Sequence, residues 1–152
     1  MLHYFGSKEQ LFIATLHVSV NPAAVVRGIL DEAEPGEMGE RLISTMLGIW
    51  DATAHHNPLV AVLRSVAGEG PVADMVRQFI ERSIITAFAE RLPGPESQLR
   101  AVLIGSQVAG LLLARYVVRL EPLASADPNR LATIYGPTIE RYAYAALPPA
   151  AP

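Results

Sequence analysis

The chain has 152 residues, of which 51% are hydrophobic and 18% are charged, and its formal net charge is −3. This composition excludes a disordered chain and suits one domain that can bury about 70% of its unfolded surface. The absence of cysteine excludes disulfides and thiolate chemistry. The basic residues form no stripe, so they do not predict a nucleic-acid surface by themselves.

The chain shows no signal for export or membrane insertion. Its first residues lack the charged region, apolar core and small-residue cleavage site of a signal peptide. The apolar run 108–114 ends at Arg115 and is too short to span a bilayer. We therefore expect a cytoplasmic protein with no membrane partner.

Helices are predicted throughout the first third of the chain. The sequence Ser7-Lys8-Glu9-Gln10 has the form of a capping box and predicts a helix over 8–18. Asn21-Pro22 interrupts that helix and can open a second one over 22–32. A third helix is predicted over 37–53, because one face collects apolar residues at three- and four-residue spacing. These residues are Met38, Leu42, Ile43, Met46, Leu47 and Trp50.

Prolines mark the starts of the remaining predicted helices. Asn57-Pro58 opens a helix over 58–67, and Pro71 opens a longer one over 71–92. The next helix, 98–120, is apolar nearly all round and must be covered on more than one face. Asp127-Pro128 caps the last helix, 128–146, in which a kink is expected at Gly136-Pro137.

The two last helices also predict self-association. We expect an all-α domain that forms a two-fold dimer, with helices 98–120 and 128–146 of both subunits making a four-helix bundle. The expected interface residues are Val108, Leu112, Tyr116, Ile134 and Tyr142. The alternative is a monomer whose own helices cover both faces of 98–120.

Three segments resemble one family of bacterial regulators. The sequence LHYFGSKEQLF (2–12) resembles the junction of the tetracycline-repressor (TetR) family, where the aromatic end of the recognition helix leads into the helix joining two domains. GERLISTMLGIW (39–50), RYVVRLEPLASADP (115–128) and, more loosely, Leu63-Arg64-Ser65 resemble the C-terminal domain of an actinobacterial-type branch. The resemblance implies a TetR-like helical bundle in a ligand-responsive, DNA-binding transcriptional regulator, most simply a repressor.

The same resemblance implies a division of the chain. Residues 1–6 would be the end of the recognition helix of a truncated helix-turn-helix domain, 7–147 the ligand-binding and dimerisation domain, and 148–152 a tail. His3, Tyr4 and Lys8 would lie near DNA phosphates in the intact protein, where they position the duplex without reading bases. The alternative is that Tyr4 and Phe5 are core residues packing under Leu11. Operator DNA is expected as a partner only when the N-terminal domain is present.

No catalytic, metal or cofactor site is predicted. His55 and His56 are adjacent, so on a helix they point about 100° apart and rarely share one ion. Serines lack a neighbouring His/Asp constellation, and the glycine pairs lack a phosphate-loop context.

A pocket for a small apolar effector is predicted inside each subunit. The expected liners are Met46, Trp50, Phe79 and Leu111, with Arg64 and Gln107 orienting the ligand because both sit among apolar neighbours. A closed core with these residues as filler is the alternative. At the level of function, the alternative is an all-helical enzyme or carrier with an apolar small-molecule pocket. The capped linker helix and the recognition-helix end favour the regulator.

Overall fold

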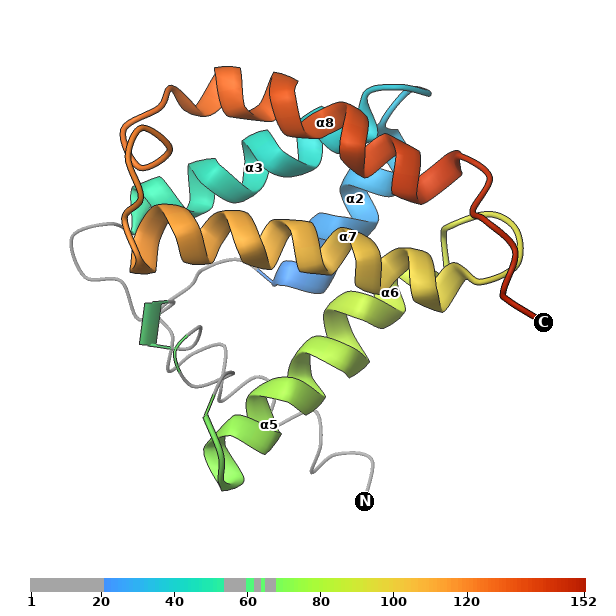
Figure 1. Cartoon of the computed structure of the whole chain (residues 1–152), viewed down its shortest axis with the longest axis horizontal. Coiled ribbons are helices and arrows are strands. Elements are labelled where there is room, and N and C mark those ends of the chain that lie inside the picture. Colours follow the sequence, from blue (N-terminus) through green and yellow to red (C-terminus); the bar gives the residue numbers. More distant parts are fainter. Residues whose placement is uncertain (1–20, 54–59, 62–63, 65–67) are drawn as a thin grey trace.

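The computed structural model describes residues 21–53, 60–61, 64 and 68–152, and every regular element in these ranges is helical (Figure 1). The elements are α2 (Pro22–Glu32), α3 (Met38–Ala52), α5 (Pro71–Phe79), the π-helix η1 (Ile80–Ile85), α6 (Thr86–Ala89), α7 (Ser97–Leu112), the π-helix η2 (Leu113–Val117) and α8 (Pro128–Tyr144). The prediction of an all-α fold is confirmed.

The predicted helices agree with the described ones to within a few residues. The helix expected over 22–32 is α2, and those expected over 37–53 and 128–146 are α3 and α8. The helix expected over 71–92 is the continuous α5–η1–α6, and that expected over 98–120 is α7–η2. The helix predicted over 8–18 lies outside the described residues, as does most of the helix predicted over 58–67.

Side-chain caps and prolines explain where two of these helices begin. Oδ1 of Asn21 accepts hydrogen bonds from the N–H groups of Ala23 and Ala24 at 3.0 and 3.3 Å. Oδ2 of Asp127 accepts from the N–H of Arg130 at 2.9 Å. Each cap satisfies donors that the first helical turn leaves free, and a proline follows each cap residue.

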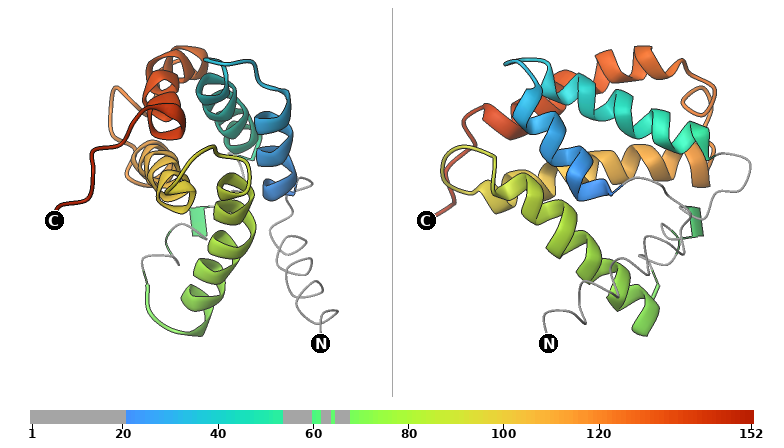
Figure 2. Two further views of the ribbon diagram at one scale, coloured as in Figure 1. Left: turned by 90° about the vertical axis from the view of Figure 1, so that its right-hand side faces the viewer. Right: turned by 180° about the vertical axis from the view of Figure 1, so that it is seen from behind.

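The helices form two layers and a projecting arm. α7 and α8 lie side by side on one face, with α2 and α3 behind them, and α5–η1 runs away from this body (Figures 1 and 2). The core between the layers is apolar. Its side chains with no more than 1% exposure are Met38, Ile43, Leu47, Ala87, Ala101, Ile104, Ala132, Ile139 and Ala143.

α3 and α8 meet backbone to backbone. A Cβ atom added to Gly39 would lie 2.2 Å from the carbonyl oxygen of Gly136, so only glycine fits at position 39. The carboxylate of Glu140 accepts a hydrogen bond from the N–H of Gly39 at 2.8 Å. It thereby caps the first turn of α3, for which no capping bond from its own N-cap residue, Glu37, is present. α8 itself continues through Gly136 and Pro137 as one helix.

Among the described residues, one helix has the length and composition of a membrane span. It is α7–η2, Ser97–Val117, and its most apolar stretch has a mean hydropathy of 1.3. Within that stretch, 28% of the residues are buried. The run 108–114 considered above is only its centre. Arg100 and Arg115 near its two ends are both buried against carbonyl groups of this chain.

Candidate functional site

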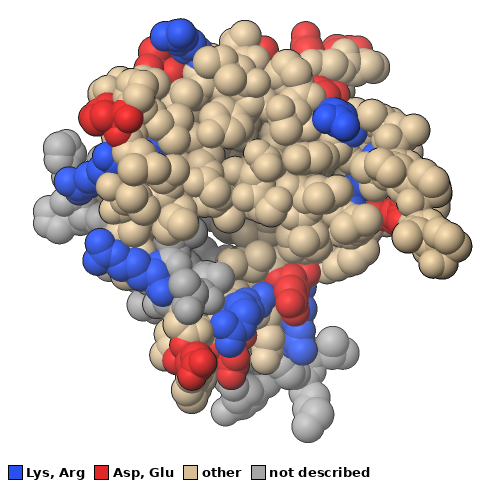
Figure 3. All heavy atoms as spheres, viewed as in Figure 1, with Lys and Arg blue, Asp and Glu red and all other residues tan. Residues whose placement is uncertain are grey.

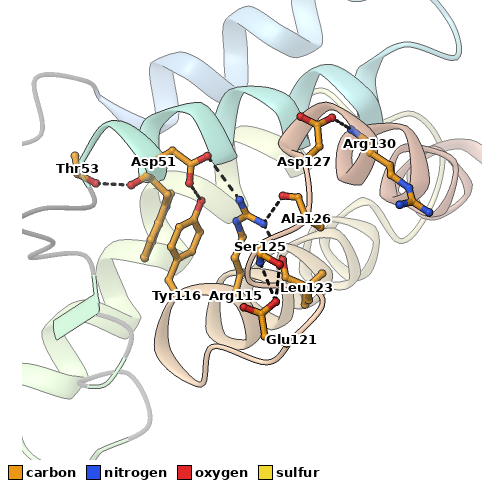
Figure 4. Close-up of polar contacts among 11 residues, drawn as sticks. Asp51, Thr53, Arg115, Tyr116, Glu121, Leu123, Ser125, Ala126, Asp127 and Arg130 are labelled. Carbon is orange, nitrogen blue, oxygen red and sulfur yellow. Dashed lines mark hydrogen bonds and ion pairs between the residues drawn. The ribbon is translucent and has the colours of Figure 1, made fainter.

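Trp50 and Tyr116 form an aromatic pair at the end of α3. Trp50 is buried in the last turn of α3, and its ring lies 5.2 Å from that of Tyr116 in η2, with an angle of 32° between the planes. The Tyr116 hydroxyl donates a hydrogen bond to Oδ1 of Asp51 at 2.5 Å (Figure 4). The pair therefore joins α3 to η2 through both ring packing and a hydrogen bond to a carboxylate.

Arg115, the neighbour of Tyr116, has only 8% of its surface exposed. Its Nη1 donates to the carbonyl oxygens of Leu123 and Ala126 at 2.8 and 2.9 Å, and its Nη2 lies 3.9 Å from Oδ2 of Asp51 (Figure 4). A buried guanidinium needs such partners to offset its lost hydration. Arg115 consequently ties the loop before α8 to the ends of α3 and α7.

The environment keeps the Tyr116 phenol protonated. Burial, and after it the hydrogen bond to Asp51, raises the pKa of Tyr116 to about 12, although the nearby Arg115 opposes the shift. The phenol is thus a donor at neutral pH, as its bond to the Asp51 carboxylate requires.

The π-helix η2 brings Arg115 and Tyr116 to the inner side of the helix. The N–H of Val118 bonds to the carbonyl of Leu113, five residues earlier, at 2.9 Å. This wider turn rotates the following side chains less per residue than an α-helix would. Two successive polar side chains can then both face α3 and the loop before α8.

The predicted effector-site residues come from three helices. Trp50 and Leu111 are buried, whereas Met46, Phe79 and Gln107 are half-buried. Arg64 is exposed. The molecular surface is hollowed between α7 and α5 (Figure 3).

A cavity lies elsewhere, between α3 and the start of α8. Its volume is about 560 Å³ and its lining is mainly polar. The lining residues are Glu37, Glu40, Arg41, Ser44, Thr45, Asn129 and Ala132. It does not have the apolar character predicted for the effector pocket.

α7 leaves one apolar stripe exposed. Leu99, Val102 and Leu113 are between 44% and 48% exposed, and Ser106, Ala109 and Gly110 lie on the same face of the helix. On α8, Ile134 is 57% and Tyr144 48% exposed. Figure 3 shows a broad uncharged surface over these two helices. We call the stripe and these two α8 residues the α7–α8 face.

The predicted interface residues are distributed differently. Only Ile134 belongs to the α7–α8 face; Val108, Tyr116 and Tyr142 are half-buried against the core, and Leu112 is buried within the subunit. Leu99, Val102 and Leu113 were not among the predicted interface residues, and the reason is that 98–120 is apolar nearly all round. Its sequence therefore does not tell which apolar face is covered by the subunit's own helices.

Within the described ranges, no group of three His, Cys, Asp or Glu side chains could hold a metal ion. The predicted DNA-contacting residues His3, Tyr4 and Lys8 lie outside those ranges, as do His55 and His56.

Comparison with known proteins gives the family. Residues 36–143 match the family model described as "Tetracyclin repressor-like, C-terminal domain". The crystal structure of a TetR-family regulator from Streptomyces coelicolor A3 is similar, with a TM-score of 0.70 and 27% sequence identity over 92% of this chain and 93% of that chain. No curated protein matches. Since the family model spans α3 to α8, the chain belongs to the TetR family of transcriptional regulators.

Proposed function

We propose that residues 7–147 are the effector-binding and dimerisation domain of a ligand-responsive repressor that acts in the cytoplasm. The observation that carries the proposal is the uncharged α7–α8 face. Large exposed apolar patches on a soluble subunit mark interaction sites. The family match favours a regulator over a helical enzyme or carrier.

In the proposed homodimer, the α7–α8 faces of two subunits meet about a two-fold axis. Two helices from each subunit then make a four-helix bundle. The small residues Ser106, Ala109 and Gly110 allow close approach of the two α7 helices, and Leu99, Val102 and Leu113 supply apolar contact. This arrangement accounts for the low burial of a helix as apolar as α7.

The proposed effector is a small apolar molecule bound between α3, α5 and α7. Trp50, Met46 and Phe79 offer large or adaptable surfaces, and Gln107 is the half-buried polar group that would orient the ligand. Arg64 is exposed and would contact the effector only from the edge of the proposed pocket.

DNA binding belongs to a helix-turn-helix domain preceding this one, with His3, Tyr4 and Lys8 near phosphates. Effector binding would change the spacing of two such domains in the dimer. Such coupling is reciprocal, so operator DNA should weaken effector binding by the factor by which effector weakens DNA binding.

Sedimentation of the whole chain tests the dimer. Val102→Glu and Leu113→Glu place charges on side chains that the subunit leaves exposed, so each should yield a folded monomer. Val72→Glu is the matched control, because Val72 is 60% exposed but lies on α5, outside the α7–α8 face. A monomeric unmodified chain would contradict the dimer.

Thermal denaturation with a panel of apolar small molecules tests the effector site. A ligand that binds should raise the Tm of the unmodified chain. The rise should shrink in Gln107→Ala and Phe79→Ala, and persist in Val72→Ala. If no compound shifts the Tm, only the dimerisation role is left.

A further inference from the structure

Two buried arginines hold α8 at its two ends, and one of them is also joined to α3. We infer that Asp51, Arg115 and Tyr116 form a relay that couples the Trp50 end of α3 to the start of α8, so that occupancy of the effector site changes the α7–α8 face. This inference rests on the proposed effector site and dimer.

The relay begins at Asp51, which directly follows Trp50 in the last turn of α3. Its two carboxylate oxygens serve different partners: Oδ1 accepts from the Tyr116 hydroxyl, and Oδ2 faces Nη2 of Arg115. The Tyr116 ring also packs against Trp50. A ligand that displaces Trp50 must therefore disturb η2 through the ring contact, the carboxylate or both.

The relay continues from Arg115 to α8. Nη1 of Arg115 holds the carbonyls of Leu123 and Ala126, and the residue after Ala126 is Asp127, the N-cap of α8. The loop is also bonded within itself, since the Ser125 hydroxyl donates to the Glu121 carboxylate at 2.6 Å. A shift of the guanidinium should consequently move the loop and the first turn of α8 together.

The burial of Arg115 makes the connection between Asp51 and the loop before α8 stiff. Nε of Arg115 is buried and has no hydrogen-bond partner in the described part of the chain, so the contacts described for the guanidinium are those of Nη1 and Nη2. Losing either carbonyl would leave a donor of the buried guanidinium unpaired. The bonds to Asp51, Leu123 and Ala126 are therefore expected to be kept or broken as a set.

Arg100 provides an internal comparison. Its Nη1 donates to the carbonyls of Tyr142 and Ala145 at 2.9 and 2.8 Å, near the C-terminal end of α8. In the described ranges Arg100 makes no ion pair with a carboxylate, whereas Arg115 lies near Asp51. Arg100 anchors the C-terminal end of α8 alone, whereas Arg115 joins the loop before α8 to Asp51 of α3, in addition to the direct packing of α3 on α8.

The test uses the whole chain and its single tryptophan, Trp50. Tyr116→Phe keeps the ring and removes the hydroxyl, and Asp51→Asn keeps the shape and removes the charge. Each should weaken the dimer about tenfold in sedimentation, the scale expected for a hydrogen bond to a charged group. Tyr135→Phe, a half-buried tyrosine of α8, is the matched control and should have no effect.

The fluorescence emission of Trp50 provides a second readout. If the network only stabilised the fold, this emission would not depend on dimerisation. In the unmodified chain the emission should change as dilution dissociates the dimer, although Trp50 lies outside the α7–α8 face. In Tyr116→Phe and Asp51→Asn it should no longer follow dissociation, and the double variant should weaken the dimer no more than either single one. Melting curves verify that each variant is folded.

The outcomes separate the two proposals. A dimer whose affinity and Trp50 emission are unchanged in both variants would overturn the relay alone. A monomeric unmodified chain would overturn the proposed dimer and, with it, the relay.

Discussion

The two ends of α7 use the same chemistry for different purposes. Arg100 and Arg115 are equally buried, and each donates two hydrogen bonds from Nη1 to carbonyl oxygens next to α8. The Arg100 end has no carboxylate partner among the described residues. The Arg115 end is joined to Asp51 and Tyr116, beside Trp50. A buried arginine can thus be a local anchor or part of a network, and its neighbours decide which.

The largest expected effect is the loss of stability when either buried arginine is replaced by alanine, and this loss should differ between the two. Arg115→Ala should lower the free energy of unfolding by about 3 kcal/mol, because it orphans two partly buried carbonyls and removes the cation near the half-exposed Asp51. Arg100→Ala should cost about 2–3 kcal/mol, because it orphans carbonyls only. Urea unfolding at one protein concentration measures both. Equal losses would show that the network around Arg115 adds nothing.

A second prediction tests the contact between α3 and α8 apart from both arginines. Gly39→Ala should lower the free energy of unfolding by about 2–3 kcal/mol, because its Cβ would collide with the backbone at Gly136 and force the helices apart. Gly48→Ala on the same helix is the control. Nothing lies within 4 Å of its added Cβ, so that change should stabilise α3 by about 0.5–1 kcal/mol. Equal melting temperatures of the two variants would contradict the close contact.

The smallest expected effect concerns alkaline pH at the Arg115 end. The pKa of Tyr116 is about 12 in the folded chain and 10.0 for an unperturbed tyrosine. The unfolded chain therefore releases this proton first. The contribution of Tyr116 to stability is fully present below pH 10 and is lost as the pH rises to about 12.

Unfolding measured across this pH range in the unmodified chain and in Tyr116→Phe isolates the contribution. The difference in stability between the two proteins should shrink as the pH rises. A constant difference would mean that the hydroxyl is not held by Asp51.

The helices could be predicted from the sequence because the signals that start them are local. Asn21-Pro22 and Asp127-Pro128 predicted helix starts that the structure shows with capping bonds from both side chains. The sequence placed Trp50 in an effector site and Tyr116 in a dimer interface, whereas the structure brings their rings together. The ligand-orienting role of Arg64 stays a prediction for an exposed side chain, whereas Arg115, seen only as the end of an apolar run, is buried beside Trp50 and Tyr116. A single arginine among apolar residues has the same local pattern in both cases.

The sequence by itself determined the helical class, the starts of α2 and α8, and the resemblance to a family that the comparisons then established. These depend on groups within about four residues of one another or on short motifs. Only the tertiary structure decided which face of α7 is covered and what the buried arginines hold. Arg100 reaches a carbonyl 45 residues away, and Tyr116 a carboxylate 65 residues away. No local pattern encodes such partners, because they meet only when the layers pack.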